Sequence, residues 1–241
     1  MSVEVGVTRG SGATLARSLT YRLLSQAFAY PLPGAVSQLV EEDLELALAG
    51  KASMPPGVPE ALDAYAAALR DVVAEDLETA YRDAFSHIHS ADCPMFETDY
   101  GARDVWRQSN VLADIAGFYR AFGIREHGER PDHVSAEFEF LHLLAYKQAW
   151  AEARGEQEHL ALCRDAERTF LRDHVLTWIP GFAARVEAVA GDGVYGRAAR
   201  LADAVLRAEA DRLGLPIAED LVPTPPGSLE EEASAFCEVD P

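Results

Sequence analysis

Residues 59–87 read PEALDAYAAALRDVVAEDLETAYRDAFSH, and this stretch decides the fold class. Apolar side chains recur along it every three or four positions, which is the period of a helix with one buried face. The apolar stripe consists of Leu62, Tyr65, Leu69, Val72, Val73, Leu77, Tyr81, Phe85 and Ile88. We therefore predict one long helix over 59–87.

The same period continues on both sides of this stretch. It predicts helices over 12–30, 35–49, 103–122, 133–153 and 156–177, a short helix that reaches Ala190, and a last helix over 195–213. Pro31 and Pro33 should end the first helix, and Pro180 with Gly181 should break the chain before the short one. The composition is dominated by strong helix formers, and runs of Val, Ile and Thr are nearly absent. An all-α protein is expected.

Short connections between helices favour one bundle. We expect residues 1–221 to form a single domain of about eight to ten helices, with the polar connector at 124–131 as its hinge. Residues 222–241 are acidic and rich in proline. Such a segment buries too little apolar surface to offset the entropy of ordering, so this tail is expected to be disordered.

The charge of the chain narrows the class of partner. The formal net charge is −19. A nucleic acid or an anionic membrane would be repelled, whereas a basic peptide would be attracted. The acidity also has a plain explanation, because a high net charge keeps a protein in solution. The two readings are equally compatible with the composition.

The sequence also argues against a disulfide-bonded or zinc-binding scaffold, a membrane span and the common catalytic motifs. The chain has three widely spaced cysteines and no Cys-x-x-Cys, which indicates neither a disulfide framework nor a zinc site. Stable membrane insertion is not expected, because no apolar run approaches the length of a span, and no signal segment precedes the first helix. We therefore expect a cytoplasmic protein. Nucleophile-elbow, P-loop, dinucleotide-binding and zinc-protease motifs are absent, so the sequence indicates no enzymatic activity and no cofactor.

Two motifs raise the alternative of a di-metal helical bundle. Glu139 with His142, and Glu156 with His159, are Glu-x-x-His pairs of the kind that contributes to di-iron sites. Such a site needs further inward carboxylates from two more helices, and Glu156 lies in a polar run that should face water. A second possible cluster consists of His87, His89 and Cys93. We favour a structural or surface role for both and assign no metal ligand.

An aromatic and acidic stretch is the best candidate for a binding surface. Tyr81 and Phe85 share one face near a helix end, and Phe96 and Tyr100 follow with Glu97 and Asp99 between them. Exposed aromatics among carboxylates could hold a peptide that carries apolar and arginine side chains. The alternative is that the aromatics only fix the loop to the core.

A third feature follows the hinge. Asp132 is a plausible N-cap of the helix over 133–153, and His133 lies in its first turn. With Glu129 and Glu137 nearby, Asp132 would also form an anionic corner suited to a guanidinium group.

Four segments carry a resemblance to a known family. They are Tyr81-Arg82-Asp83-Ala84-Phe85, the run Cys93-Pro94-Met95-Phe96-Glu97-Thr98-Asp99-Tyr100-Gly101, Glu129-Arg130-Pro131-Asp132-His133 and Glu137-Phe138-Glu139-Phe140. In order and spacing, over about 75–150, they resemble the TorD/DmsD/NarJ family of redox-enzyme maturation chaperones. The form of the second segment is similar to chaperones that serve dimethyl-sulfoxide-reductase-type molybdoenzymes. Phe96 and Tyr100 stand where some members have tryptophans, and Asp132 with His133 matches the family's hinge pair.

The resemblance implies an all-helical chaperone without catalytic activity. Its partner would be the apo catalytic subunit of a molybdenum oxidoreductase, gripped by its twin-arginine signal peptide until the cofactor is inserted. The resemblance allows a monomer or a homodimer, and it allows binding to the body of the subunit instead of the signal peptide. A generic adaptor is the other alternative. The residues expected to bind the client are Tyr81, Phe85, Phe96, Glu97, Tyr100, Asp132, His133 and Glu137.

Overall fold

The computed structural model describes residues 9–32, 39–72, 74–85, 93–101, 104–124 and 130–218. Within these ranges the chain forms helices and no strand, which confirms the all-α prediction. Most of the expected hinge, residues 125–129, lies outside these described ranges. The expected tail over 222–241 also lies outside them. None of the helices in the described ranges combines the length and the hydrophobicity that a membrane crossing requires.

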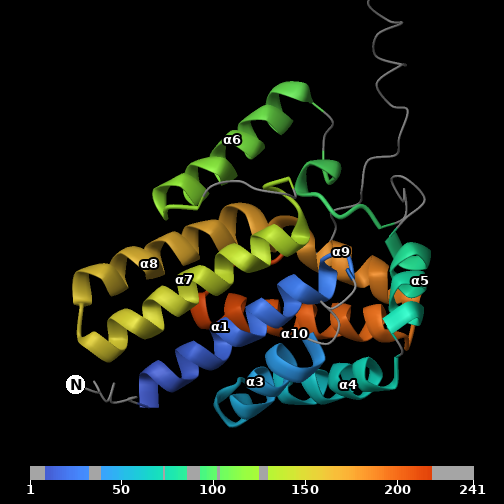
Figure 1. Ribbon diagram of the computed structural model, residues 1–241. Helices are drawn as coiled ribbons and strands as arrows, with labels where there is room; N and C mark the ends of the chain where they lie inside the picture. The colour runs from blue at the N-terminus through green and yellow to red at the C-terminus, as the bar shows by residue number, and fades with distance from the viewer. Residues whose placement is uncertain are drawn as a thin grey trace, which may run out of the picture.

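The core is built around one pair of helices. Helix α1 (Arg9–Phe28) packs most extensively against α7 (Val134–Arg154), and α8 (Gln157–Phe170) covers another side of α7. Helix α10 (Val194–Leu213) packs against α9 (Leu176–Ala190) and α4 (Val58–Asp71). Short helical segments at Leu39–Asp43 and Leu44–Ala49 (α3) contact α1. Helix α6 (Val105–Ala121), at the top of Figure 1, packs Phe118 and Tyr119 against aromatic side chains of α7 and α8.

The prediction of a single helix over 59–87 is wrong. It is divided into α4 and α5 (Ala74–Phe85), because Val72 adopts extended backbone angles. Consecutive β-branched valines are poor helix formers, so the break falls where the helix is locally weakest. The break lets both pieces pack against α10.

The break predicted at Pro180 is also wrong. Helix α8 passes through a π-helical turn, η4 (Leu171–Val175), directly into α9, which contains Pro180. Proline has no N–H to donate to the Leu176 carbonyl, which would be left without its helical partner. The Ala218 N–H fills this place at 3.2 Å, from the segment that follows α10. A contact distant in sequence thus allows the proline inside the helix.

Candidate functional site

The two most specific motif segments meet directly in space. Phe96 and His133 form an antiparallel bridge, flanked by hydrogen bonds from Glu97 N to Asp132 O and from Val134 N to Met95 O, both 2.9 Å. The turn η3 (Glu97–Asp99) and the start of α7 are thereby locked together. The structure therefore brings Phe96, Glu97, Asp132 and His133 into one place, which we call the motif junction.

Asp132 is the polar centre of the motif junction. Its side chain is completely buried. One carboxylate oxygen accepts hydrogen bonds from the Thr98 hydroxyl at 2.7 Å, the Thr98 N–H at 3.3 Å and the Arg130 guanidinium at 2.8 Å. The other oxygen accepts from Arg130 Nε at 3.1 Å. The chain's own arginine thus lies where the sequence suggested a partner's guanidinium.

The predicted N-cap is wrong by one residue. Helix α7 is capped by His133, whose ring nitrogen accepts from the Ser135 N–H at 3.2 Å. Asp132 cannot serve as the cap because its oxygens are committed to Thr98 and Arg130. The His133 ring also packs edge-on against Phe96, with 5.1 Å between the centroids.

A chain of buried polar groups leads from the motif junction into the core. Trp178 on α9 donates its indole N–H to Glu137 at 3.0 Å, and Glu137 hydrogen-bonds to Glu97. His174 in η4 contacts Glu97 at 3.0 Å and the exposed Asp114 of α6 at 3.2 Å. Five elements are therefore joined by one network that sequence spacing alone could not reveal.

Two residues of this network, Glu137 and His174, have shifted pKa values. Burial, followed by the charge of Glu97, raises the pKa of Glu137 well above its usual value, although the Trp178 hydrogen bond acts in the opposite direction. Burial lowers the pKa of His174, but its hydrogen bonds and charge interactions with Glu97 and Asp114 outweigh this and raise it overall. Glu137 therefore favours its protonated form and His174 its charged form.

The expectation of an exposed aromatic surface is wrong for most of the residues involved. Tyr81 and Phe85 are buried and pack edge-on against Tyr195, with centroid distances of 5.7 and 5.1 Å. Tyr100 is fully buried, packs on Trp178 and donates its hydroxyl to the Pro94 carbonyl at 3.0 Å. These aromatics fix the loop to the core, which was the alternative reading. Their part in client binding stays a prediction.

Exposed apolar side chains close to the motif junction lie instead at the start of α6. Trp106 is 80% exposed and Val105 65%. The helix is anchored to the motif junction by Arg107, which donates to the Tyr100 carbonyl at 3.1 Å, and by Gln108, which donates to the Thr98 carbonyl at 3.3 Å. The junction therefore holds an exposed tryptophan at its edge.

The sequence contained a signal for this exposure. Trp106 precedes the buried Ile115 by nine residues, which is about two and a half helical turns and places the two on opposite faces of α6.

The two Glu-x-x-His pairs do not converge. The Glu139 side chain is exposed, while His142 hydrogen-bonds to Ser18 of α1 at 2.9 Å. Glu156 pairs with His159 on the surface at 2.9 Å. Within the described ranges no three His, Cys, Asp or Glu side chains gather closely enough to hold a metal ion. His87 and His89 lie outside those ranges.

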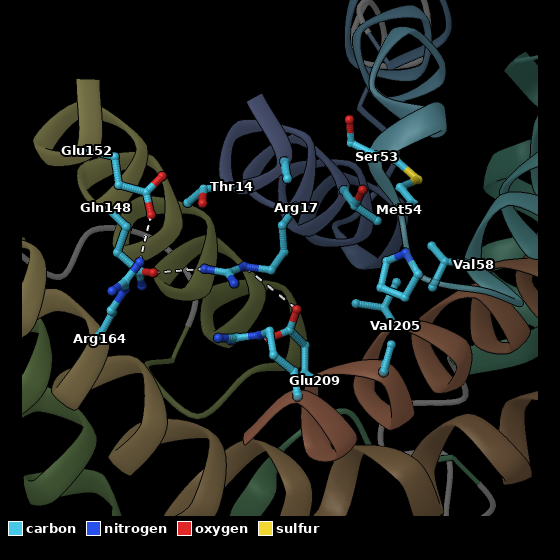
Figure 2. Close-up of a pocket in the computed structure, with 15 residues that line it drawn as sticks. Thr14, Arg17, Ser53, Met54, Val58, Gln148, Glu152, Arg164, Val205 and Glu209 are labelled. Atoms are coloured by element: carbon cyan, nitrogen blue, oxygen red, sulfur yellow. Dashed lines mark hydrogen bonds and ion pairs between the residues drawn. The ribbon is translucent and has the colours of Figure 1, made fainter. Parts of the chain in front are cut away.

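A separate cavity of about 330 Å³ lies near the C-terminal end of α7, bounded by α1, α8, α10 and the turn before α4 (Figure 2). Three guanidinium groups line it, and each pairs with a carboxylate. Arg17 contacts Glu167 at 3.0 Å, Arg164 contacts Glu152 at 2.9 Å, and Arg212 contacts Glu167 at 2.8 Å. The arginines of this cavity therefore join helices and are not available to an anion without breaking an ion pair.

Comparison with protein families matches residues 51–184 to the family described as nitrate reductase delta subunit. The chain belongs to this family. The match confirms the TorD/DmsD/NarJ resemblance and includes all residues of the motif junction.

Individual relatives carry names of assembly chaperones. The chain is 28% identical over 197 residues to a selenate reductase assembly chaperone of Thauera selenatis, covering 80% of this chain and 88% of that protein. It is 36% identical over 88 residues to a perchlorate reductase assembly chaperone of Dechloromonas aromatica, a match that spans 34% of this chain and only 38% of that protein. A solved redox enzyme maturation protein from Archaeoglobus fulgidus is 23% identical with a TM-score of 0.46, over 79% of this chain and 93% of that one.

Proposed function

We propose that this protein is a cytoplasmic, non-catalytic assembly chaperone for the catalytic subunit of a molybdenum oxidoreductase. It would bind the apo subunit, chiefly through a twin-arginine signal peptide, and delay export until the cofactor is inserted. The proposal is supported by membership of the nitrate reductase delta subunit family and by the relatives named after selenate and perchlorate reductases.

The structural observation that supports it most is the exposed start of α6. Trp106 and Val105 offer an apolar surface, and the acidic side chains of Asp104, the N-cap of α6, and of Asp114 within the helix are exposed. A twin-arginine signal peptide combines positive charges with an apolar segment, so the two are complementary. Exposed aromatics of this kind are frequent energetic anchors of interfaces.

The residues expected from the sequence divide into two groups under this proposal. Phe96 is only partly buried and would contact the peptide directly. Tyr81, Phe85, Glu97, Tyr100, His133 and Glu137 are buried, so they would act by holding the motif junction and the start of α6 in position. Asp132 is also buried and would support the junction in the same way while Arg130 covers it.

Titration calorimetry with a synthetic twin-arginine signal peptide tests the surface. The peptide should come from the catalytic subunit of a molybdoenzyme of the same host. Trp106→Ala should weaken binding about tenfold or more, because an interface tryptophan often contributes more than 1.4 kcal/mol, while stability stays unchanged. Trp150→Ala is the matched control, since Trp150 is also an exposed tryptophan but lies on α7. Equal losses in the two variants, or none in either, would contradict the proposed surface.

The chaperone role itself is tested by metal content. A host that lacks this protein should accumulate the catalytic subunit with little bound molybdenum, and the wild-type chain should restore it. A subunit fully loaded without the chaperone would refute the role. Stoichiometric iron or manganese in the purified chain would instead favour a di-metal protein.

A further inference from the structure

The guanidinium of Arg130 occupies a site with the features of an arginine receptor. It stacks over the Phe96 ring with its central carbon 4.3 Å from the centroid. It donates to both oxygens of Asp132, at 2.8 and 3.1 Å, and to the Thr98 hydroxyl at 2.8 Å. An aromatic face, a carboxylate taken in a two-pronged contact and a hydroxyl acceptor together match the shape and charge of a planar guanidinium.

The receptor groups are held in place without help from Arg130. Thr98 binds the Asp132 carboxylate through its hydroxyl and its N–H. The backbone bond from Glu97 N to Asp132 O fixes the same two segments, and the His133 ring packs edge-on against Phe96. Removal of the arginine side chain should therefore leave the receptor groups close to their present places.

Arg130 itself is only loosely enclosed. Its side chain is 47% exposed, whereas Asp132 beneath it has no exposed surface. An arginine in this position can move into water without uncovering the apolar core. Another guanidinium that takes its place makes the same hydrogen bonds and the same stacking contact, so the exchange is nearly balanced in energy.

We propose that Phe96, Thr98 and Asp132 form a guanidinium-binding site, which Arg130 fills in the free protein and an arginine of the bound partner takes over. The partner's identity rests on the proposed function, but the site's chemistry does not. Arg130 acts as an internal competitor. A peptide with one arginine gains little by the exchange, so binding requires further contacts such as the apolar surface at Trp106.

The test uses N-acetyl-argininamide as a single-arginine probe, with binding followed by ligand-observed NMR. Arg130→Ala removes the competitor and should bind the probe about five- to thirtyfold more tightly than the wild type, the range expected when an exposed ion pair and a cation–π contact no longer compete. N-acetyl-lysinamide carries the same charge without the planar fork, and its affinity should change little. Adding Phe96→Leu to Arg130→Ala should reverse most of the gain.

Arg120→Ala is the charge-matched control, because Arg120 is an exposed arginine on α6. It should leave the affinity for the probe at the wild-type value. Circular dichroism establishes that each variant is folded. Equal affinities of wild type and Arg130→Ala, or an equal gain for the lysine probe, would overturn the proposal. Neither outcome bears on molybdenum loading, so failure of the site and failure of the chaperone role can be told apart.

Discussion

The substitution Asp132→Asn separates a structural role of this carboxylate from a capping role. If Asp132 were only the N-cap of α7, asparagine would replace it almost without loss. In the structure the cap is His133, and Asp132 joins η3 to the start of α7 through Thr98 and Arg130. The substitution should therefore destabilise the fold.

The size of the effect follows from the contacts. Asparagine keeps one oxygen, which can still accept from Thr98, but it turns an NH₂ group toward the Arg130 guanidinium and removes the charge. One charge-assisted hydrogen bond is lost, which costs about 1.5–3 kcal/mol when both groups are buried. Arg130 is about half exposed, so solvent reduces the effect, and we expect a loss of about 2 kcal/mol. For a chain of this size that corresponds to a fall in Tm of about 4–8 °C.

Urea unfolding followed by circular dichroism at pH 7 measures this loss. Asp165→Asn, at an exposed position on α8, removes the same charge and should change stability by less than about 0.5 kcal/mol. A double-mutant cycle with Arg130→Gln should give a coupling energy of about 1 kcal/mol. A loss below about 0.5 kcal/mol for Asp132→Asn, together with no coupling, would refute the ion pair as described.

Two further predictions concern packing and pH. A Cβ added at Gly196 would lie 2.0 Å from the Gly191 carbonyl oxygen, so Gly196→Ala should lower the free energy of unfolding by about 3 kcal/mol or more. A Cβ added at Gly117 meets no described atom within 4 Å, so Gly117→Ala should raise it by about 0.5–1 kcal/mol. Thermal unfolding measures both, and a similar Tm for the two variants would contradict this packing. The raised pKa of His174 means that the folded protein binds its proton more tightly than the unfolded chain, so this stabilisation is complete below the ordinary value of 6.5 and is lost as pH rises through the folded pKa. The Tm advantage of wild type over His174→Gln should accordingly be larger at pH 6 than at pH 9, and a constant difference would show that the contact with Glu97 does not depend on the proton.

Much of the fold could be predicted from local pattern, and the errors arise from contacts between residues that are distant in sequence. Helical periodicity located α1, α7, α8 and α10 because each has a buried face along its length, and α6 although its buried residues lie only in its C-terminal half. The break at Val72 and the continuity of the helix through Pro180 were not predicted, because local pattern does not show distant contacts. Both depend on partners far away in sequence, namely α10 for the two helix pieces and Ala218 for the free carbonyl.

The sequence predicted some of the residues that meet at the motif junction, but not how deeply they are buried. The motif segments indicated which residues gather, and Phe96, Glu97, Asp132 and His133 do meet. Sequence could not show that a buried network with His174 and Trp178 would draw the acidic residues inward. Nor could it show that the carboxylate would already hold an arginine of the same chain.

The burial of the family motif changes how a loss of binding should be interpreted. Thr98 and Tyr100 hold the start of α6 through their backbone carbonyls, so a variant that disturbs the motif junction also displaces Trp106. Such a variant would lose client binding without any contact to the client. A residue that touches the peptide should lose affinity at constant Tm, because its side chain is exposed and contributes little to folding. Affinity and Tm measured together therefore separate Trp106, expected to act by contact alone, from Asp132, which also supports the fold and whose loss should lower both.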